Sequence, residues 1–370
     1  MIIERITTHA IRVPLPRVFY GSNYAYTHKK AMTIEIECSD GLVGQAYLGD
    51  DFGLGSAAAS LAGGAMSDSL IGKDSSNIAN LWQSLRPFAR DILGDRRVAL
   101  HTQALIDIGL WDLAGKRAGQ PLGRLWGNHC EDRPVIVVGA YYDSKKQAED
   151  YGTEALDLQN KGYGGLKMKV GGLSPEEDAA RVKAVREACG EDFIIAADAN
   201  QGWSYSEALE FIDLVEDLNL LWFEEPVHWE NDRAEMAKLK AERSIPICGA
   251  QSELSYEGAK ALMDMNAIDY CNLHAGYVGG MTPWLKMAEL ASKQNVRVAN
   301  TGEPQLSLQM MTAFAHGSPI EVYQPDRDPV FYHLVVRPEE IAGGRIKRPQ
   351  AVGWGYDLDY DFIEEFKVLD

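Results

Sequence analysis

The chain has 370 residues, of which 46% are hydrophobic and 24% charged, and its formal net charge is −18 at pH 7. This composition is typical of a soluble globular protein, and the length favours one large barrel with a smaller companion domain over a single compact unit. The acidic balance argues against a nucleic acid or an anionic membrane surface as partner, because both carry charge of the same sign. An anionic substrate would have to be attracted locally, by lysines and a metal ion.

The first part of the chain predicts an α+β domain over residues 1–125. Three runs rich in Ile, Val and Thr come first, at residues 2–13, 31–38 and 42–47. Ser39-Asp40-Gly41 supplies a hairpin turn between the last two runs. Three helical patterns follow, at about 56–71, 76–90 and 97–118. The segment 326–370 differs in composition, with many Pro, Gly and charged residues, and it ends in an amphipathic stretch. This pattern predicts that the segment returns to the first domain.

Residues 126–325 predict a closed parallel barrel, because short β-rich runs alternate there with helical patterns. The runs cover 135–142, 165–170, 193–197, 220–224, 245–249, 268–273, 296–299 and 320–323. Strands in this rhythm indicate an α/β protein with a (β/α)8-type, modified TIM barrel. Ser174-Pro175, followed by two glutamates, predicts the start of one of the helices. Chemistry is then expected at the carboxyl ends of the strands.

The five cysteines are widely separated and show no CxxC spacing. We therefore expect reduced core thiols. The amino-terminal residues enter a strand-like pattern directly, and no apolar run has the length of a membrane span. These features predict a cytoplasmic protein that is neither secreted nor inserted in a membrane.

Two lysines alternate on the second predicted barrel strand, so Lys167 and Lys169 point to the same face. An amine beside another cation has a lowered pKa and can act as a base near neutral pH. Asp198 and Glu224 stand near the ends of the next two strands, where they could hold a divalent metal that stabilises the resulting anion. The pattern predicts metal-assisted proton abstraction.

Four motifs, in order, resemble those of the mandelate racemase branch of the enolase superfamily. They are the helix 104–116, Leu166-Lys167-Met168-Lys169, Asp198-Ala199-Asn200 and Phe223-Glu224-Glu225-Pro226. The resemblance covers nearly the whole chain and implies a barrel with an α+β N-terminal capping domain. It also implies that a proton α to a carboxylate is removed and that Mg²⁺ holds the enediolate.

The resemblance assigns roles to individual residues. Lys169 would be the base, and Lys167 would modify its pKa and contact the substrate carboxylate. Asp198 and Glu224 would bind the metal, since oxygen ligands with open coordination positions suit Mg²⁺. Glu321, on the eighth strand, matches an electrophilic carboxylic acid that donates a hydrogen bond to a substrate carboxylate oxygen when protonated.

The chain departs from the family pattern at two places. An acidic third ligand is implied after the fifth strand, but Gly249-Ala250-Gln251-Ser252-Glu253 stands there, which leaves Gln251, Glu253 or no protein ligand. The Asp and His of the family's second base correspond to His274 and Thr301. A racemase needs a proton carrier on each face, whereas a dehydratase can act with few groups, so dehydration is favoured, with His274 or a water as general acid.

The substrate is expected under two loops, 19–28 and 48–52, which in the superfamily close over the barrel mouth. Tyr24 and His28 are candidate substrate-binding residues, although the first loop could instead be an exposed aromatic turn; Asn200 would orient a ligand or line the pocket.

The leading hypothesis is a Mg²⁺-dependent dehydratase that converts a sugar acid of the aldonate or aldarate type to a 2-keto-3-deoxy acid. The alternatives are a racemase, epimerase or lactone cycloisomerase, and a barrel that binds an acid metabolite without turnover. A small-molecule carboxylate is thus the expected partner, and a homo-oligomer is the expected assembly.

Overall fold

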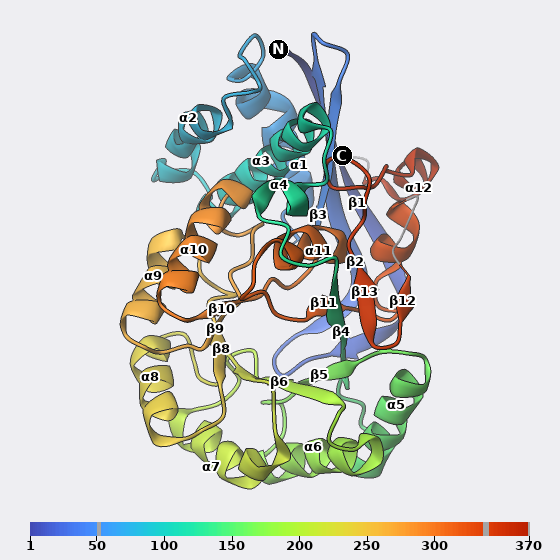
Figure 1. Ribbon diagram of the computed structural model, residues 1–370, viewed down its shortest axis with the longest axis vertical. Helices are drawn as coiled ribbons and strands as arrows, with labels where there is room; N and C mark the ends of the chain where they lie inside the picture. Colours follow the sequence, from blue (N-terminus) through green and yellow to red (C-terminus); the bar gives the residue numbers. More distant parts are fainter. Residues whose placement is uncertain (50–52, 336–339, 369–370) are drawn as a thin grey trace.

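The computed structural model describes residues 1–49, 53–335 and 340–368, so Asp50, Asp51 and Phe52 of the second predicted loop lie outside the described residues. An antiparallel sheet with helices occupies the upper part of the view in Figure 1, and a barrel with its surrounding helices fills the lower part. Both chain termini lie in the upper part, beside the sheet. No helix in these three stretches is long and apolar enough to cross a membrane.

The N-terminal sheet pairs three antiparallel strands, β1 (Ile3–Tyr20), β2 (Ala25–Cys38) and β3 (Val43–Gly49). The predicted turn between β2 and β3 is confirmed, and Gly41 adopts a left-handed φ of +80° that favours glycine. The buried face of the sheet packs on α3 (Arg96–Ala118), where Gly109 allows close approach to β2. The other elements here are α1 (Gly55–Leu61), the π-helix η1 (Ala62–Met66), α2 (Ile78–Arg90) and α4 (Leu122–Trp126).

Eight parallel strands form the barrel. They are β4 (Asp132–Gly139), β5 (Gly165–Lys169), β6 (Ile194–Asp198), β7 (Phe223–Glu224), β8 (Ile247–Gly249), β9 (Tyr270–Cys271), β10 (Arg297–Val298) and β11 (Ile320–Val322). Neighbours in the sequence are neighbours in the sheet from β4 to β10. The barrel closes because β11 pairs with β4 and Val298 forms a bridge with Gly317. The predicted fold class is therefore confirmed, and the second strand, β5, faces the sixth, β9, across the barrel.

The helices that follow the strands cover the outside of the barrel (Figure 1). They are α5 (Ala148–Asn160), α6 (Pro175–Cys189), α7 (Tyr205–Val215) with a 3-10 turn η2 (Glu216–Leu218), α8 (Asp232–Glu242), α9 (Tyr256–Asp264), α10 (Met281–Lys293) and α11 (Pro304–Ala313). The predicted start of α6 is confirmed, since the Ser174 hydroxyl accepts a hydrogen bond from the Glu177 backbone N–H.

Apolar side chains fill the barrel interior below the charged residues. A separate buried cluster consists of Ile136, Ala196, Cys248 and Tyr270, which lie on β4, β6, β8 and β9, and Trp222, which directly precedes β7. Alternate residues of a strand share a face, so the residues two positions after Ala196 and Trp222, Asp198 and Glu224, continue this interior face toward the carboxyl ends. The strands thereby bring their acidic residues to the barrel mouth.

The C-terminal segment contacts both parts of the molecule. A strand pair, β12 (Ile341–Ala342) and β13 (Arg345–Lys347), extends the barrel sheet, because β13 pairs antiparallel with β4. A π-helix, η3 (Val330–Leu334), precedes this pair, and α12 (Tyr360–Phe366) follows it. Beyond α12, Lys367 forms a bridge with Ile11 of β1, while the Trp354 indole N–H donates to the Ile108 carbonyl of α3. The domain boundaries at 125 and 325 stay a prediction.

Candidate active site

Two lysines and three carboxylates meet at the barrel mouth, and we call Lys167, Lys169, Asp198, Glu224 and Glu321 the lysine–carboxylate cluster. The Lys167 ammonium lies 2.8 Å from Glu224 Oε2, 2.9 Å from Glu321 Oε1 and 3.4 Å from Asp198 Oδ2. The Lys169 ammonium lies 2.7 Å from the same oxygen of Asp198. All five side chains are buried. The barrel therefore brings together the predicted base, its neighbour, two predicted metal ligands and the predicted electrophile.

The pKa of Lys169 is raised in this cluster. Burial has the largest effect and lowers the pKa, as does the charge of Lys167, but the Asp198 carboxylate, together with smaller contributions from Tyr141 and Tyr323, leaves it above its ordinary value. Burial likewise lowers the pKa of Lys167, and Glu224, Glu321 and Asp198 together raise it well above its ordinary value. Repulsion from Lys167 does lower the pKa of Lys169, but the predicted net lowering is wrong, because the nearby carboxylates raise the pKa of both lysines by more.

Asp198, Glu224 and Gln251 offer oxygen ligands at the ends of three successive strands. Burial raises the pKa of Glu224 to about 8, against the opposing pull of Lys167. The Gln251 side-chain oxygen, just beyond β8, is buried and has no hydrogen-bond partner. A buried oxygen without a donor is unusual, and a bound cation would satisfy it. This donor set fits Mg²⁺.

Glu253 is not brought to the cluster. The backbone turns at Ala250, whose φ is +84°, and the next residues are held by Glu225, which accepts hydrogen bonds from the Ser252 N–H at 3.0 Å and hydroxyl at 3.2 Å. The Glu253 carboxylate consequently forms an ion pair with Arg233. It lines a cavity of about 480 Å³ whose lining contains no residue of the lysine–carboxylate cluster. Of the two candidate third ligands, the geometry supports Gln251.

Two of the predicted substrate-binding residues adjoin Lys169. The Asn200 side-chain oxygen accepts a hydrogen bond from the Lys169 ammonium at 3.1 Å, and the Asn200 N–H donates to Asp198 at 3.0 Å. The Lys169 ammonium also lies 5.7 Å from the centre of the Tyr24 ring, a cation–π arrangement. The tip of the β1–β2 hairpin is tied down here, because the Asn23 amide donates to the Asn200 carbonyl. The hairpin thus reaches the predicted base.

His28 is directed elsewhere, and its neighbour Lys29 approaches the mouth instead. The His28 ring nitrogen Nδ1 lies 2.9 Å from the Thr27 hydroxyl and 3.4 Å from an Arg12 nitrogen on β1. Lys29 is buried, and its ammonium lies 3.4 Å from Asp328. Successive residues of a strand point to opposite faces, so His28 and Lys29 could not both face the substrate. The alternation allows only one of the two to face the mouth, and the contacts of Lys29 show which one it is.

Across the barrel from Lys169, His274 follows β9 and lies near Glu303. The His274 nitrogen Nε2 is 4.0 Å from Glu303 Oε2, and both side chains are buried. The imidazole stacks on Tyr277 with ring centres 4.0 Å apart and an angle of 11°. Thr301, at the position of the missing family histidine, donates a hydrogen bond to Glu321 at 2.8 Å. Thr301 is identified in the sequence only as the position of the missing histidine, and no motif points to Glu303.

Family models account for most of the chain. Residues 6–127 match the mandelate racemase / muconate lactonizing enzyme N-terminal domain, and residues 150–362 match the enolase C-terminal domain-like model. The chain belongs to the mandelate racemase / muconate lactonizing enzyme family. The resemblance to the enolase superfamily indicated by the motifs is thereby confirmed.

Known relatives of this family member include a dehydratase and a cycloisomerase. The arabinonate dehydratase of Saccharolobus solfataricus is 30% identical over 343 residues, which cover 90% of this chain and 89% of the relative. The D-galactarolactone cycloisomerase of Agrobacterium fabrum is 29% identical, with 100% of each chain covered. A mandelate racemase/muconate lactonizing enzyme from a marine actinobacterium, crystallised in complex with magnesium, is 35% identical with a TM-score of 0.92 and 99% of each chain covered.

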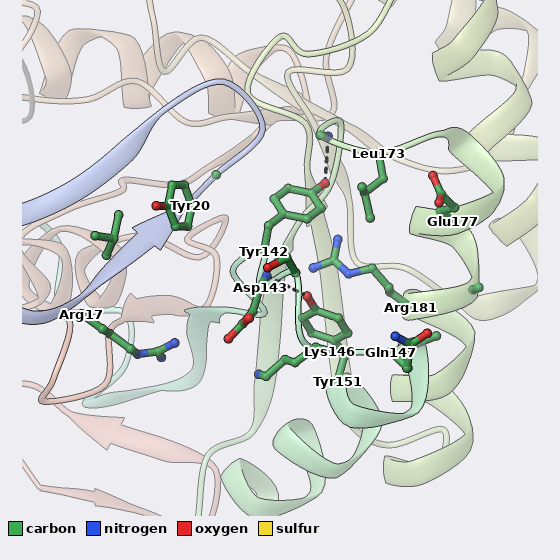
Figure 2. Close-up of a pocket in the computed structure, with 16 residues that line it drawn as sticks. Arg17, Tyr20, Tyr142, Asp143, Lys146, Gln147, Tyr151, Leu173, Glu177 and Arg181 are labelled. Atoms are coloured by element: carbon green, nitrogen blue, oxygen red, sulfur yellow. Dashed lines mark hydrogen bonds between the residues drawn. The ribbon is translucent and has the colours of Figure 1, made fainter.

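A cavity of about 900 Å³ lies beside the lysine–carboxylate cluster of this family member. Figure 2 shows the side chains around the cavity. Its cations already have carboxylate partners: Arg17 lies near Asp326, Lys146 near Glu154 and Arg181 near Asp178. An anionic substrate would therefore meet little uncompensated positive charge there. We place the chemistry at the lysine–carboxylate cluster instead.

Arg181 connects this cavity to the predicted base. Its guanidinium lies 4.3 Å from the Tyr142 ring centre and 4.2 Å from that of Tyr151. It donates to the Lys169 backbone carbonyl at 2.8 Å and also to the Ala140 carbonyl. The strand ends that carry Lys169 are thus held from behind by a buried, charged side chain.

Proposed function

We propose that the chain is a Mg²⁺-dependent dehydratase of a sugar acid, of the aldonate or aldarate type, that forms a 2-keto-3-deoxy acid. The observation that carries the proposal is the buried Lys169, whose ammonium lies 2.7 Å from Asp198, a candidate metal ligand that Lys167 also contacts. The arabinonate dehydratase and the magnesium-containing structure among the relatives support the substrate class and the metal.

Each residue of the cluster has a distinct task in this reaction. Asp198, Glu224 and Gln251 would hold Mg²⁺, which supplies positive charge beside the substrate carboxylate. The Lys167 ammonium would donate a hydrogen bond to that carboxylate, and Glu321, which accepts hydrogen bonds from Lys167 and Thr301, would border it. Lys169, in its neutral form, takes the α-proton.

Asp198 would couple metal binding to the protonation of Lys169. It is the strongest of the charges that raise the pKa of Lys169, whereas burial and Lys167 lower it. If the Asp198 carboxylate binds Mg²⁺, its attraction for the Lys169 ammonium would weaken. Lys169 then moves toward the neutral form that a base requires.

A screen of acid sugars with Mg²⁺ tests the proposal. We expect at least one aldonate or aldarate to yield a 2-keto acid, detected with a carbonyl reagent and confirmed by mass spectrometry. Exchange of the α-proton in D₂O with no 2-keto acid would support a racemase or epimerase instead. Formation of a ring-opened or ring-closed isomer would support a cycloisomerase, the second candidate, which the Agrobacterium fabrum relative favours. Binding without exchange or turnover would support a non-catalytic role.

Gln251→Leu is expected to weaken Mg²⁺ binding by about 10- to 100-fold, because it removes one oxygen ligand while preserving the side-chain size. Isothermal titration calorimetry measures this change directly. Glu253→Gln is the matched control and should leave the affinity unchanged, since the Glu253 carboxylate is paired with Arg233. The reverse pattern, with normal affinity in Gln251→Leu and weak affinity in Glu253→Gln, would make Glu253 the ligand.

We also propose that the enzyme works in the cytoplasm as a homo-oligomer. All five cysteines are free thiols, and four of them are buried, which suits a reducing compartment. Light scattering coupled to size-exclusion chromatography would test the assembly. A single species at the mass of one chain would exclude it.

A further inference from the structure

His274 and Glu303 form a buried pair on the side of the barrel opposite Lys169. Lys169 ends the second barrel strand, β5, and His274 follows the sixth, β9, so an eight-stranded barrel places them across its mouth. Glu303 comes from the loop after the seventh strand, β10. Two residues earlier in that loop, Thr301 donates a hydrogen bond to Glu321, so the loop borders the lysine–carboxylate cluster.

The surroundings of His274 fix the position of its proton. The Gly276 backbone N–H donates a hydrogen bond to His274 Nδ1 at 3.0 Å. A backbone N–H can only donate, so Nδ1 must be the acceptor and the neutral ring must carry its proton on Nε2. Nε2 is the atom that faces Glu303 Oε2, at 4.0 Å. The ring is thus preset as a donor toward a carboxylate.

The ring has little freedom to turn away from Glu303. Tyr277 stacks against one face of it. A Cβ at Gly276 would lie 2.9 Å from the His274 carbon Cε1, and a Cβ at Gly302 would lie 3.0 Å from Nε2. Any larger residue at Gly276 or Gly302 would therefore displace the imidazole.

Glu303 has polar partners on its other side as well. Its Oε1 accepts a hydrogen bond from the Gly49 backbone N–H, at the end of β3. The Lys29 ammonium lies 3.8 Å from the point that a Gly49 Cβ would occupy, and Glu303 Oε1 lies 2.8 Å from the same point. The carboxyl group is therefore held between His274, the Gly49 N–H and the neighbourhood of Lys29.

We infer that Glu303 is the group that handles the second proton, on the face opposite Lys169, and that His274 is its positioning residue. This rests on the proposed function and replaces His274 as the predicted general acid. An imidazole protonated on both nitrogens would lose the Gly276 hydrogen bond, which makes His274 a poor proton donor, whereas a positioned carboxyl group can donate and accept.

The dehydration step then balances as follows. The α-carbon proton moves to Lys169, and the C–H electron pair becomes part of the new carbon–carbon double bond. The β-carbon–oxygen bond breaks, its electron pair stays on oxygen, and a proton carried on Glu303 Oε2 joins that oxygen to release water; the His274 Nε2–H and the Gly49 N–H face the carboxylate that is left. The enol product tautomerises to the 2-keto acid, and Lys169 and Glu303 return to their starting states by proton exchange with solvent.

Glu303→Gln separates the two faces experimentally. In D₂O, the variant should lose about 10²- to 10⁴-fold in 2-keto acid formation. It should still exchange the α-proton, because Lys169 is untouched, and retained exchange also shows that the variant is folded. Wild-type turnover in the variant, or loss of both exchange and turnover, would overturn the role of Glu303. A wild-type protein that shows neither exchange nor product would instead count against the proposed function.

Paired variants of His274 test the positioning role. His274→Phe keeps an aromatic ring but removes the donor, and we expect turnover to fall about 10- to 100-fold with α-proton exchange retained. His274→Gln restores an N–H donor and should recover part of the loss, which a purely structural role would not predict. Equal turnover in the two variants would overturn the role of His274.

Discussion

Lys169→Ala is expected to lower kcat by about 10²- to 10⁴-fold, the usual contribution of a positioned general base. The variant should also lose exchange of the substrate α-proton with D₂O, because Lys169 is the group assigned to that proton. Mass spectrometry of recovered substrate and product measures both effects. Substrate binding should change little, since Lys167 and Glu321 remain to contact the carboxylate.

Lys146→Ala is the matched control for this experiment. Lys146 is also a partly buried lysine with a carboxylate partner, Glu154, but it lines the side cavity of Figure 2 and not the cluster. We expect near-normal turnover from it. Retained α-proton exchange in Lys169→Ala would move the role of base to another residue, whereas equal losses in the two variants would point to a general effect of removing a lysine.

Asp178→Ala should lower the free energy of unfolding by about 3–5 kcal/mol, because it leaves the buried Arg181 guanidinium without its carboxylate. Asp178 also accepts hydrogen bonds from the Tyr142 hydroxyl at 2.8 Å and from the Gly171 N–H at 2.8 Å. Denaturation in urea measures the loss. Since Arg181 holds the Lys169 carbonyl, turnover should fall as well.

Two further variants make the Asp178 result decisive. Asp157→Ala removes an acid of α5 whose ion pair with Lys161 is largely exposed, and we expect a cost below about 1 kcal/mol. In Asp178→Ala combined with Arg181→Met, the unpaired charge is gone, so the double variant should be more stable than Asp178→Ala alone. Similar stability of Asp157→Ala and Asp178→Ala would show that the buried pair contributes no special stability.

The sequence predicted those parts of the site that depend on local periodicity. Lys167 and Lys169 share a face because strand residues alternate, and Asp198 and Glu224 end consecutive strands whose rhythm was visible in the chain. The barrel followed from the same rhythm. Each of these features is set by residues within one or two neighbouring strands.

The errors lie where loops and distant segments decide the geometry. The sequence cannot separate Glu253 from Gln251 as a ligand, because the turn at Ala250 and the hydrogen bonds from Ser252 to Glu225 depend on tertiary structure. No sequence pattern indicates Glu303, because its partners, Gly49 and His274, come from elements far away in the chain. The raised pKa of Lys169 likewise depends on how near Asp198 lies, which strand order alone does not give.

Lys167 gives the barrel mouth a tethered cation of its own, within 3.4 Å of carboxylate oxygens on Asp198, Glu224 and Glu321. Folding therefore need not wait for Mg²⁺, unlike small metal domains whose chains order only around their ion. A Mg²⁺ ion held by Asp198, Glu224 and Gln251 would compete with the Lys167 ammonium for two of these side chains, and this competition would lower its observed affinity. At low free Mg²⁺ the enzyme would stay folded but inactive. Addition of Mg²⁺ would then restore its activity without synthesis of new protein.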